Sequence, residues 1–413
     1  MVKESLVAGI DVGSNQICCV VGALDEEHKL VKILSGAVAP CPDGIKSGVV
    51  IDIGEASKAM HRAFSEAGRN IDGQIDNIAV AVRGNFIEAH NCKGVASIPD
   101  KEVDESIVEE ALGAAQDSIR LDTGKEVLQI VPREFLLDQT SVQNPLRMEG
   151  NIIEIEALAL VASTTNLTNI LKALNGSNIN CEERLYGYMV ANDILLRKEE
   201  KESGCLLIDF GGSTTGIVHY EDSVLKYVYE LPVGSDNITK DLMHKLRASY
   251  QEASRIKIEH GAAFCPDEFQ NREFEYRAAD GVTMMKTDRQ EIVEQVIKPR
   301  LDQILYHIEE TVKKKSPQGV PGSIILTGGG SKLEYITTAF EKYFEDYRPF
   351  VRIGFPLESK IIGAQEVISD SVYTCAIGAI HSIFSNPYYS TSPQKNSLSG
   401  GFNGIINWFK EIF

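Results

Sequence analysis

Two glycine turns in the sequence each follow an aspartate near the end of an apolar run. Glycine lets backbone N–H groups approach an anion closely, and Ser and Thr side chains add hydroxyl donors. An aspartate at such a turn repels a phosphate unless Mg²⁺ or a metal-bound water lies between them. We therefore predict that the two turns clamp the phosphates of a nucleoside triphosphate, with Asp11 and Asp209 positioning magnesium through water. The predicted ligand residues are Asp11, Gly13, Ser14, Asn15 and Gln16 in the first turn and Asp209, Gly211, Gly212, Ser213 and Thr214 in the second.

A third glycine cluster follows a later apolar run at 324–326 and precedes a predicted helix at 333–344. Glycines at the end of a strand leave a flat surface on which a base and a ribose can lie. We predict an adenosine-binding loop here. Its residues are Gly328, Gly329, Gly330 and Ser331.

The elements around the first two turns repeat. Apolar runs at 7–12 and 17–22 flank the first turn, and runs at 206–210 and 215–220 flank the second, so each turn is predicted to close a β-hairpin. The two aspartates stand 198 residues apart, which indicates an internal duplication. Between them lie stretches with apolar residues every three or four positions, typical of amphipathic helices: 55–67, 104–119, 167–174, 236–246 and 290–313. Alternating strands and helices predict an α/β protein with mixed sheets.

Residues 84–162 have the pattern of a compact α+β unit inserted into this alternation. The expected elements are strands at 85–98 and 152–161, a strand pair within 127–137 and the helix at 104–119.

The order of two phosphate hairpins and one adenosine loop resembles the superfamily of actin, sugar kinases and DnaK-type chaperones. Two apolar helical segments, 188–196 and 373–383, match its connecting helices. Within it the chain is most similar to the bacterial cell-division FtsA family. The similar segments are 132–135 with Asn144 and Pro145, 199–204, 255–257 with His260 and Gly261, and 296–300.

The resemblance implies an actin-like, two-lobed ATPase fold with an FtsA-type inserted subdomain. It implies a first lobe core (1–83, 163–197 and 373–385) and an inserted subdomain (84–162). It also implies a second lobe core (198–227 and 306–372), an outer subdomain (228–305), a flexible linker (386–401) and a C-terminal amphipathic helix (402–413). It adds Gly234 and Lys257 to the ATP site.

What the family implies about function is a structural role. FtsA-type proteins form actin-like filaments and tether FtsZ filaments, through the FtsZ C-terminal tail, to the cytoplasmic face of the inner membrane at the division septum. Arg300 is the expected contact for that tail, and later division proteins are further expected partners. Gln16 and Ser254 stand where the family often has Lys and Glu, so we expect at most slow ATP hydrolysis.

The last twelve residues favour an interfacial membrane anchor. An amphipathic helix with aromatic residues on its apolar side lies in the headgroup region of a bilayer. A helix docked back on the body is the alternative, but a Ser-, Pro- and Gly-rich linker precedes the segment. The predicted membrane residues are Phe402, Ile405, Ile406, Trp408, Phe409, Ile412 and Phe413.

Composition limits the partners. The chain has 413 residues, 41 Lys and Arg against 59 Asp and Glu, and a net charge of −18. This acidity argues against nucleic acid and against electrostatic adhesion of the whole body to an anionic membrane. The alternatives are an MreB-like membrane-bound filament protein, a metabolite kinase of the same fold and a DnaK-type chaperone. The sequence shows no loop that would aim a general-base Asp at a substrate hydroxyl, as a kinase needs, and no peptide-binding β-domain, as a chaperone needs.

Overall fold

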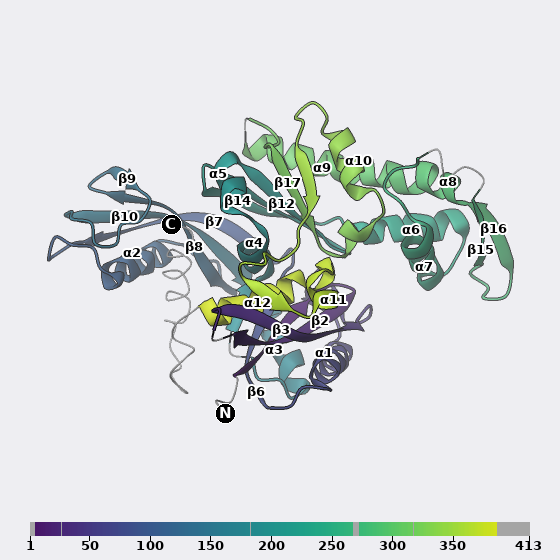
Figure 1. Ribbon diagram of the computed structural model, residues 1–413, viewed down its shortest axis with the longest axis horizontal. Coiled ribbons are helices and arrows are strands. Elements are labelled where there is room, and N and C mark those ends of the chain that lie inside the picture. The colour runs from purple at the N-terminus through teal and green to yellow at the C-terminus, as the bar shows by residue number, and fades with distance from the viewer. Residues whose placement is uncertain (1–4, 26, 182, 267–271, 317, 386–413) are drawn as a thin grey trace.

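The computed structural model describes residues 5–25, 27–181, 183–266, 272–316 and 318–385. Two lobes, each built on a mixed sheet, lie one above the other in Figure 1. A four-stranded unit extends from them at one end, and a small two-stranded sheet with its helices extends at the opposite end. The predicted linker 386–401 and the predicted amphipathic helix 402–413 lie outside the described residues.

The sheet of the first lobe has the order β11-β6-β1-β2-β3-β19. Helices α1 and α3 pack together on the side of β2 and β3, while α12 packs against β1, β2 and α4. The strands are β1 (Leu6–Val12), β2 (Gln16–Asp25), β3 (Leu30–Pro40), β6 (Ile75–Val82), β11 (Glu183–Tyr186) and β19 (Ile361–Gly363), and the small pair β4 (Ile45–Lys46) and β5 (Val49–Val50) stands apart. The helices are α1 (Ile53–Gly68), α3 (Thr164–Gly176), α4 (Gly187–Leu195), α11 (Gln365–Ile368), η4 (Ser371–Tyr373) and α12 (Thr374–Ser385).

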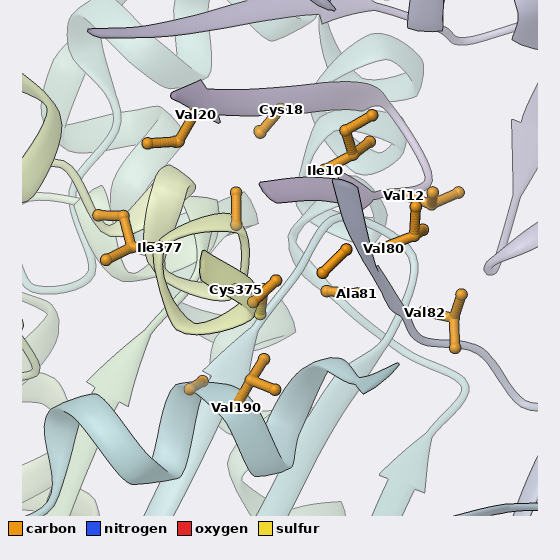
Figure 2. Close-up of a cluster of buried hydrophobic side chains, with 14 of the residues drawn as sticks. Ile10, Val12, Cys18, Val20, Val80, Ala81, Val82, Val190, Cys375 and Ile377 are labelled. Atoms are coloured by element: carbon orange, nitrogen blue, oxygen red, sulfur yellow. The ribbon is translucent and has the colours of Figure 1, made fainter. Parts of the chain in front are cut away.

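Strand β1 lies at the centre of this lobe, and all seven of its residues are buried. Six of them carry no polar side chain, and the seventh, Asp11, forms an ion pair with Arg83. Gly9 lets α12 lie directly on the strand, since a Cβ atom there would lie 2.0 Å from the carbonyl oxygen of Ala376. Side chains from β1, β2, β6, α4 and α12 fill the layer between sheet and helices, as Figure 2 shows.

The sheet of the second lobe has the order β14-β13-β12-β17-β18. Its central hairpin strand β12 pairs antiparallel with β13 and parallel with β17, just as β1 pairs with β2 and β6. This repeated order confirms the predicted α/β class with mixed sheets and the predicted internal duplication for the described residues. The elements are α5 (Lys198–Ser203), β12 (Cys205–Phe210), β13 (Thr215–Glu221), β14 (Val224–Leu231), β17 (Ser323–Thr327), η3 (Gly329–Lys332), α10 (Ile336–Tyr343) and β18 (Phe350–Ile353).

One predicted range crosses between lobes. The resemblance assigns 306–372 to the second lobe, but β19 within that range pairs in parallel with β3 of the first sheet. β19 has only three residues, so no alternating pattern in the sequence marks this return to the first lobe.

The inserted unit is a sheet of order β7-β10-β8-β9 covered by α2. Gly94 allows the helix to lie close, because a Cβ atom there would lie 1.9 Å from the carbonyl oxygen of Ala111. The strand pair expected within 127–137 is wrong: a single strand of 13 residues, β8, runs through it, and Pro132 lies inside it beside a register shift. The elements are β7 (Ile87–Ser97), α2 (Glu105–Asp117), β8 (Lys125–Leu137), β9 (Thr140–Val142) and β10 (Ile152–Ser163).

The helix expected at 290–313 is also divided in the structure. A π-helical segment, η2, separates α8 from α9, and Pro299 stands in the first turn of α9. Proline has no backbone N–H, so the regular i to i−4 bonding is interrupted at this point. These elements and their neighbours are α6 (Ser235–Leu246), α7 (Tyr250–His260), β15 (Glu273–Arg277), β16 (Met284–Asp288), α8 (Arg289–Ile292), η2 (Val293–Ile297) and α9 (Lys298–Lys315). In the described ranges, no helix has both the length and the apolar composition that crossing a bilayer requires.

Candidate functional site

The two predicted hairpins have the same local geometry. A Cβ atom on Gly13 would lie 2.7 Å from the carbonyl oxygen of Gln16, and one on Gly211 would lie 2.8 Å from that of Thr214. Both glycines therefore stand where the turn folds back on itself and where a side chain would collide. The duplication seen in the sequence thus extends to the conformation of the two turns.

The structure brings the two turns into contact. The Asn15 side chain donates a hydrogen bond of 2.6 Å to Asp236 at the start of α6, and the Ser213 hydroxyl donates one of 3.4 Å to the same carboxylate. A Cβ atom on Gly212 would lie 2.7 Å from the Asn15 side-chain nitrogen. Asn15 and Ser213, predicted to bind phosphates, are thus bonded to Asp236, which the sequence did not single out.

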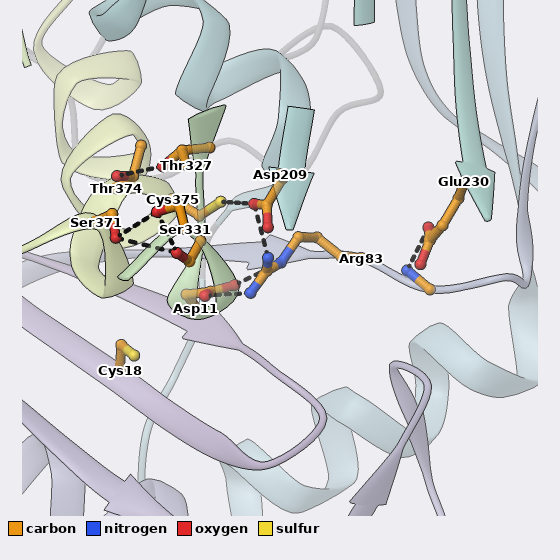
Figure 3. Close-up of polar contacts among 12 residues, drawn as sticks. Asp11, Cys18, Arg83, Asp209, Glu230, Thr327, Ser331, Ser371, Thr374 and Cys375 are labelled. Carbon is orange, nitrogen blue, oxygen red and sulfur yellow. Dashed lines mark hydrogen bonds and ion pairs between the residues drawn. The ribbon is translucent and has the colours of Figure 1, made fainter. Parts of the chain in front are cut away.

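Asp11 and Asp209 lie on either side of one guanidinium group, that of Arg83 (Figure 3). Arg83 donates from Nε and Nη2 to the two oxygens of Asp11, at 3.1 and 2.6 Å. It donates from Nη1 to Oδ2 of Asp209 at 2.9 Å. All three side chains are largely buried, with 15%, 3% and 4% of their surface exposed for Arg83, Asp11 and Asp209.

Burial raises the pKa of Asp11 to about 6, although the Arg83 charge acts in the opposite direction. The sequence did not identify Arg83 as a site residue. The available signal was its position directly after the apolar run 78–82, at the carboxyl end of a strand next to β1.

The predicted magnesium position does not fit this arrangement. Mg²⁺ requires near-octahedral oxygen ligands, and three of the four carboxylate oxygens that would hold its waters accept hydrogen bonds from Arg83. Within the described ranges no group of three or more His, Cys, Asp or Glu side chains is arranged to hold a metal ion.

Asp209 also lies close to Cys375 and Gly328. Cys375 of α12 donates to its Oδ2 at 3.7 Å, whereas its Oδ1 is buried without a hydrogen-bond partner among the described residues. A Cβ atom on Gly328 would lie 2.4 Å from that Oδ1. Glycine at 328, with a φ of 82°, is therefore required both by the backbone and by the approach of the carboxylate.

The predicted adenosine loop folds as the short helix η3 directly after β17. The Ser331 hydroxyl is buried and donates to the carbonyl oxygen of Gly328 at 2.7 Å, and Ser371 donates to the same oxygen at 3.0 Å. The Thr327 hydroxyl lies 3.0 Å from that of Thr374 (Figure 3). The loop is thus bonded to η4 and α12 of the first lobe, and Ser331 is used to shape it.

Gly234 and Lys257 lie beside the second hairpin. Gly234 precedes α6, and a Cβ atom on it would lie 2.4 Å from the carbonyl oxygen of Gly212. The Lys257 ammonium donates to the carbonyl oxygen of Ser235 at 3.2 Å, and burial lowers its pKa. Both residues are close to the turn that the sequence predicts to bind phosphate. Of the two departures from the family, Gln16 directs its amide toward Cys18, and Ser254 lies within α7.

Glu230 of β14 is a further buried acid that the sequence did not identify. Its Oε2 accepts a hydrogen bond of 3.1 Å from the backbone N–H of Gly84, and its Oε1 is buried without a partner among the described residues (Figure 3). Burial raises the pKa of Glu230 to about 7.

Arg300 lies apart from the cleft, in the first turn of α9. Its Nη2 donates to Oδ1 of Asp241 in α6 at 2.9 Å, and its guanidinium is partly exposed. The predicted membrane residues within 402–413 lie outside the described part of the chain.

Two family models match the chain. "Cell division protein FtsA" matches residues 206–378, and "SHS2 domain inserted in FTSA" matches residues 84–161. The cell division protein FtsA of Pseudomonas aeruginosa is 25% identical over 401 residues, which cover 97% of this chain and 92% of that protein. The FtsA of Borreliella burgdorferi is 28% identical over 383 residues, which cover 92% and 91%.

Solved structures of similar fold include the PilM–PilN type IV pilus biogenesis complex, with a TM-score of 0.66 and 16% identity over 91% of this chain and 97% of that one. The MamK double helical filament has a TM-score of 0.51 and 13% identity over 91% and 98%. MreB5 of Spiroplasma citri bound to ADP has a TM-score of 0.50 and 13% identity over 91% and 95%. These likenesses support the actin-like fold. The family is shown by the two family models and by relatives that match over nearly the whole chain: the chain belongs to the FtsA family of cell division proteins.

Proposed function

We propose that this chain binds ATP or ADP in the cleft between its lobes, assembles into filaments and tethers FtsZ filaments to the cytoplasmic face of the membrane at the division site. One observation carries the nucleotide part: two hairpins of matching geometry meet with Asp11 and Asp209 at their base, beside a glycine loop. MreB5, a protein of similar fold, is described as bound to ADP, which is in keeping with this proposal.

The proposed chemistry of the site is binding rather than turnover. Backbone N–H groups of the turns at Gly13 and Gly211 would face the phosphates, and η3 would support the adenosine. The nucleotide would then act as a ligand that holds the two lobes together, because each lobe contributes one hairpin.

Filament formation is the second part of the proposal. MamK, of similar fold, is described as a double helical filament. The inserted unit, residues 84–161, projects from one end of the molecule (Figure 1) and offers a surface to a second copy.

The proposed FtsZ contact is the face of α9 that carries Arg300. The guanidinium retains partial exposure beside Asp241, and arginine binds carboxylates through paired hydrogen bonds. An acidic tail peptide would compete with Asp241 for it.

The proposed membrane contact is the segment 402–413, on the strength of its sequence alone. The six predicted membrane residues other than Trp408, at about 1.5–3 kcal/mol each, set a ceiling of roughly 9–18 kcal/mol, and partial insertion and helix ordering reduce it. A single chain would therefore bind reversibly, whereas a filament carrying many such segments would bind tightly through effective concentration.

The test is sedimentation of the full-length chain with anionic liposomes and a peptide of the FtsZ C-terminal tail. We expect Trp408→Glu to abolish sedimentation of chain and peptide. Asn407→Glu, which places the same charge on the polar side, should retain most of the sedimentation.

Arg300→Glu should release the peptide but leave the chain bound to the liposomes, and Lys298→Glu is the matched control. Sedimentation that survives Trp408→Glu would reject the anchor. ATP consumption that rises with added sugars would favour a metabolite kinase instead.

A further inference from the structure

Arg83 and Gly328 each follow the strand that runs parallel to the aspartate strand of their half, although their registers differ by one residue: Asp11 pairs with Ala81 and Asp209 with Thr327. Strand β6 runs parallel to β1 and ends at Val82, so that Arg83 follows it. Strand β17 runs parallel to β12 and ends at Thr327, so that Gly328 follows it. In the second half the residue after the strand is Gly328, which has no side chain, whereas in the first half it is Arg83, whose guanidinium is positively charged.

The surrounding backbone leaves room for this arginine. A Cβ atom on Gly187, at the start of α4, would lie 2.6 and 2.9 Å from Cγ and Cδ of Arg83. A Cβ atom on Gly48 would lie 1.9 Å from the Arg83 carbonyl oxygen, and one on Gly13 would lie 3.5 Å from Nη2. Two glycines thus accommodate the stem and the backbone, and the guanidinium reaches the first hairpin turn.

The positive charge of Arg83 lies between the negative charges of Asp11 and Asp209. Two buried carboxylates repel each other and any phosphate near them unless a cation lies between them. The guanidinium is always protonated and lies within 3.1 Å of both carboxylates. A metal ion between the two carboxylates would have to compete with it for three of their four oxygen atoms, all except Oδ1 of Asp209.

We propose that Arg83 is the resident cation of this cleft, standing in place of a divalent metal between Asp11 and Asp209, and that the chain therefore binds ADP or ATP without a divalent metal. The second clause rests on the proposed nucleotide site. The bonds to the two carboxylates use three of the five N–H groups of the guanidinium, and the Nη2 edge that lies near Gly13 is the part aimed at a phosphate in the first turn.

The first arm of the test measures the binding of Mn²⁺ to the full-length chain in the absence of nucleotide. Electron paramagnetic resonance detects the bound ion. We expect the parent chain to show no Mn²⁺ site that depends on Asp209. Arg83→Ser should create one, because it leaves the two carboxylates without a cation, and adding Asp209→Asn should remove it. Arg69→Ser, which removes an exposed arginine, is the control.

The second arm measures ADP binding with excess magnesium and with EDTA. The parent dissociation constant should differ by less than about threefold between the two, whereas that of Arg83→Ser should rise by about tenfold or more in EDTA. The parent measurements decide the matter even if Arg83→Ser does not fold.

The outcomes separate the two proposals. A parent Mn²⁺ site that Asp209→Asn abolishes, or ADP binding by the parent only with magnesium, would overturn the inference about Arg83 and leave nucleotide binding intact. If ADP binds in neither buffer, the proposed nucleotide site and metal-free binding fall together, and the Mn²⁺ arm still decides whether Arg83 replaces a metal.

Discussion

Asn15 of the β1–β2 turn donates a hydrogen bond of 2.6 Å to Asp236 at the first turn of α6, and this bond crosses from one lobe to the other. Asp236 is buried and also accepts from Ser213 of the second hairpin. The two turns are therefore joined through one carboxylate, and the lobes are held together at the point where the phosphates of a nucleotide are expected.

Replacing Asn15 tests this cross-lobe bond. Asn15→Ala removes one hydrogen bond to a charged acceptor and should lower the free energy of unfolding by about 1.5–3 kcal/mol. Asn15→Asp should cost more, because it places a second negative charge against Asp236. Urea denaturation measures both variants, and equal stability of Asn15→Asp and the parent would contradict the contact.

Gly216 of β13 marks a second close approach between the lobes. A Cβ atom there would lie 2.2 Å from the ring of Tyr188 in α4, a buried side chain of the first lobe. Gly216→Ala should therefore destabilise the chain by about 1–3 kcal/mol through overpacking. Gly113→Ala is the matched control: it lies in α2 with no atom within 4 Å of its Cβ position, and it should be neutral or stabilise by up to about 1 kcal/mol. Thermal unfolding that ranks the two variants the other way would refute this account.

Gly187 tests the path of the Arg83 stem by coupling. Gly187→Ala alone should cost about 1–3 kcal/mol, because its Cβ would collide with the Arg83 side chain. In an Arg83→Ser background that collision is gone, so the cost of Gly187→Ala should fall by about 1 kcal/mol or more. Strict additivity in a double-mutant cycle, measured by urea denaturation, would show that the two residues do not interact.

Glu230 predicts a pH dependence of stability. Burial raises its pKa from 4.5 to about 7 in the folded chain, so the folded state binds a proton that the unfolded state has released between these values. Stability should then fall as the pH rises from about 4.5 to about 7 and level off above, by about 2 kcal/mol for a side chain that is not fully buried.

Glu230→Gln should remove the part of the decline that Glu230 causes, measured by denaturation at a series of pH values. A decline of similar size should remain, because the pKa of Asp11 is raised from 3.8 to about 6 and this group titrates in the same direction. Glu221→Gln, at the end of neighbouring β13, should keep the full decline. A parent chain whose stability rises across this range would contradict the assignment.

The hairpins were predictable from the sequence because their signal is local. Each aspartate, turn and flanking strand lies within a short stretch of chain, and apolar runs on both sides of a glycine turn favour one structure. The second half repeats the first, since Asp11 pairs with Cys18 and Asp209 pairs with Gly216 at the same position of each hairpin.

Arg83 was not predictable in the same way. Its role depends on the parallel pairing of β1 with β6, which joins residues about 70 positions apart, and no local pattern around it differs from an ordinary strand end. Glu230 was missed for the same reason, because its environment is made by Gly84 from the other lobe. Conversely, the strand pair expected within 127–137 is one continuous strand, β8, which pairs with β10 along its whole length.

Arg83 and Gly84 are consecutive, and both bond to the second lobe: Arg83 to Asp209, and Gly84 through its N–H to Glu230. The inserted unit begins at this same pair of residues. These two residues therefore link the second lobe to the root of the insert within one peptide unit. The insert also packs against β14 and β11, and its Leu158 and Leu160 belong to the core of the first lobe. A rotation of one lobe against the other would therefore act on all of these contacts at once.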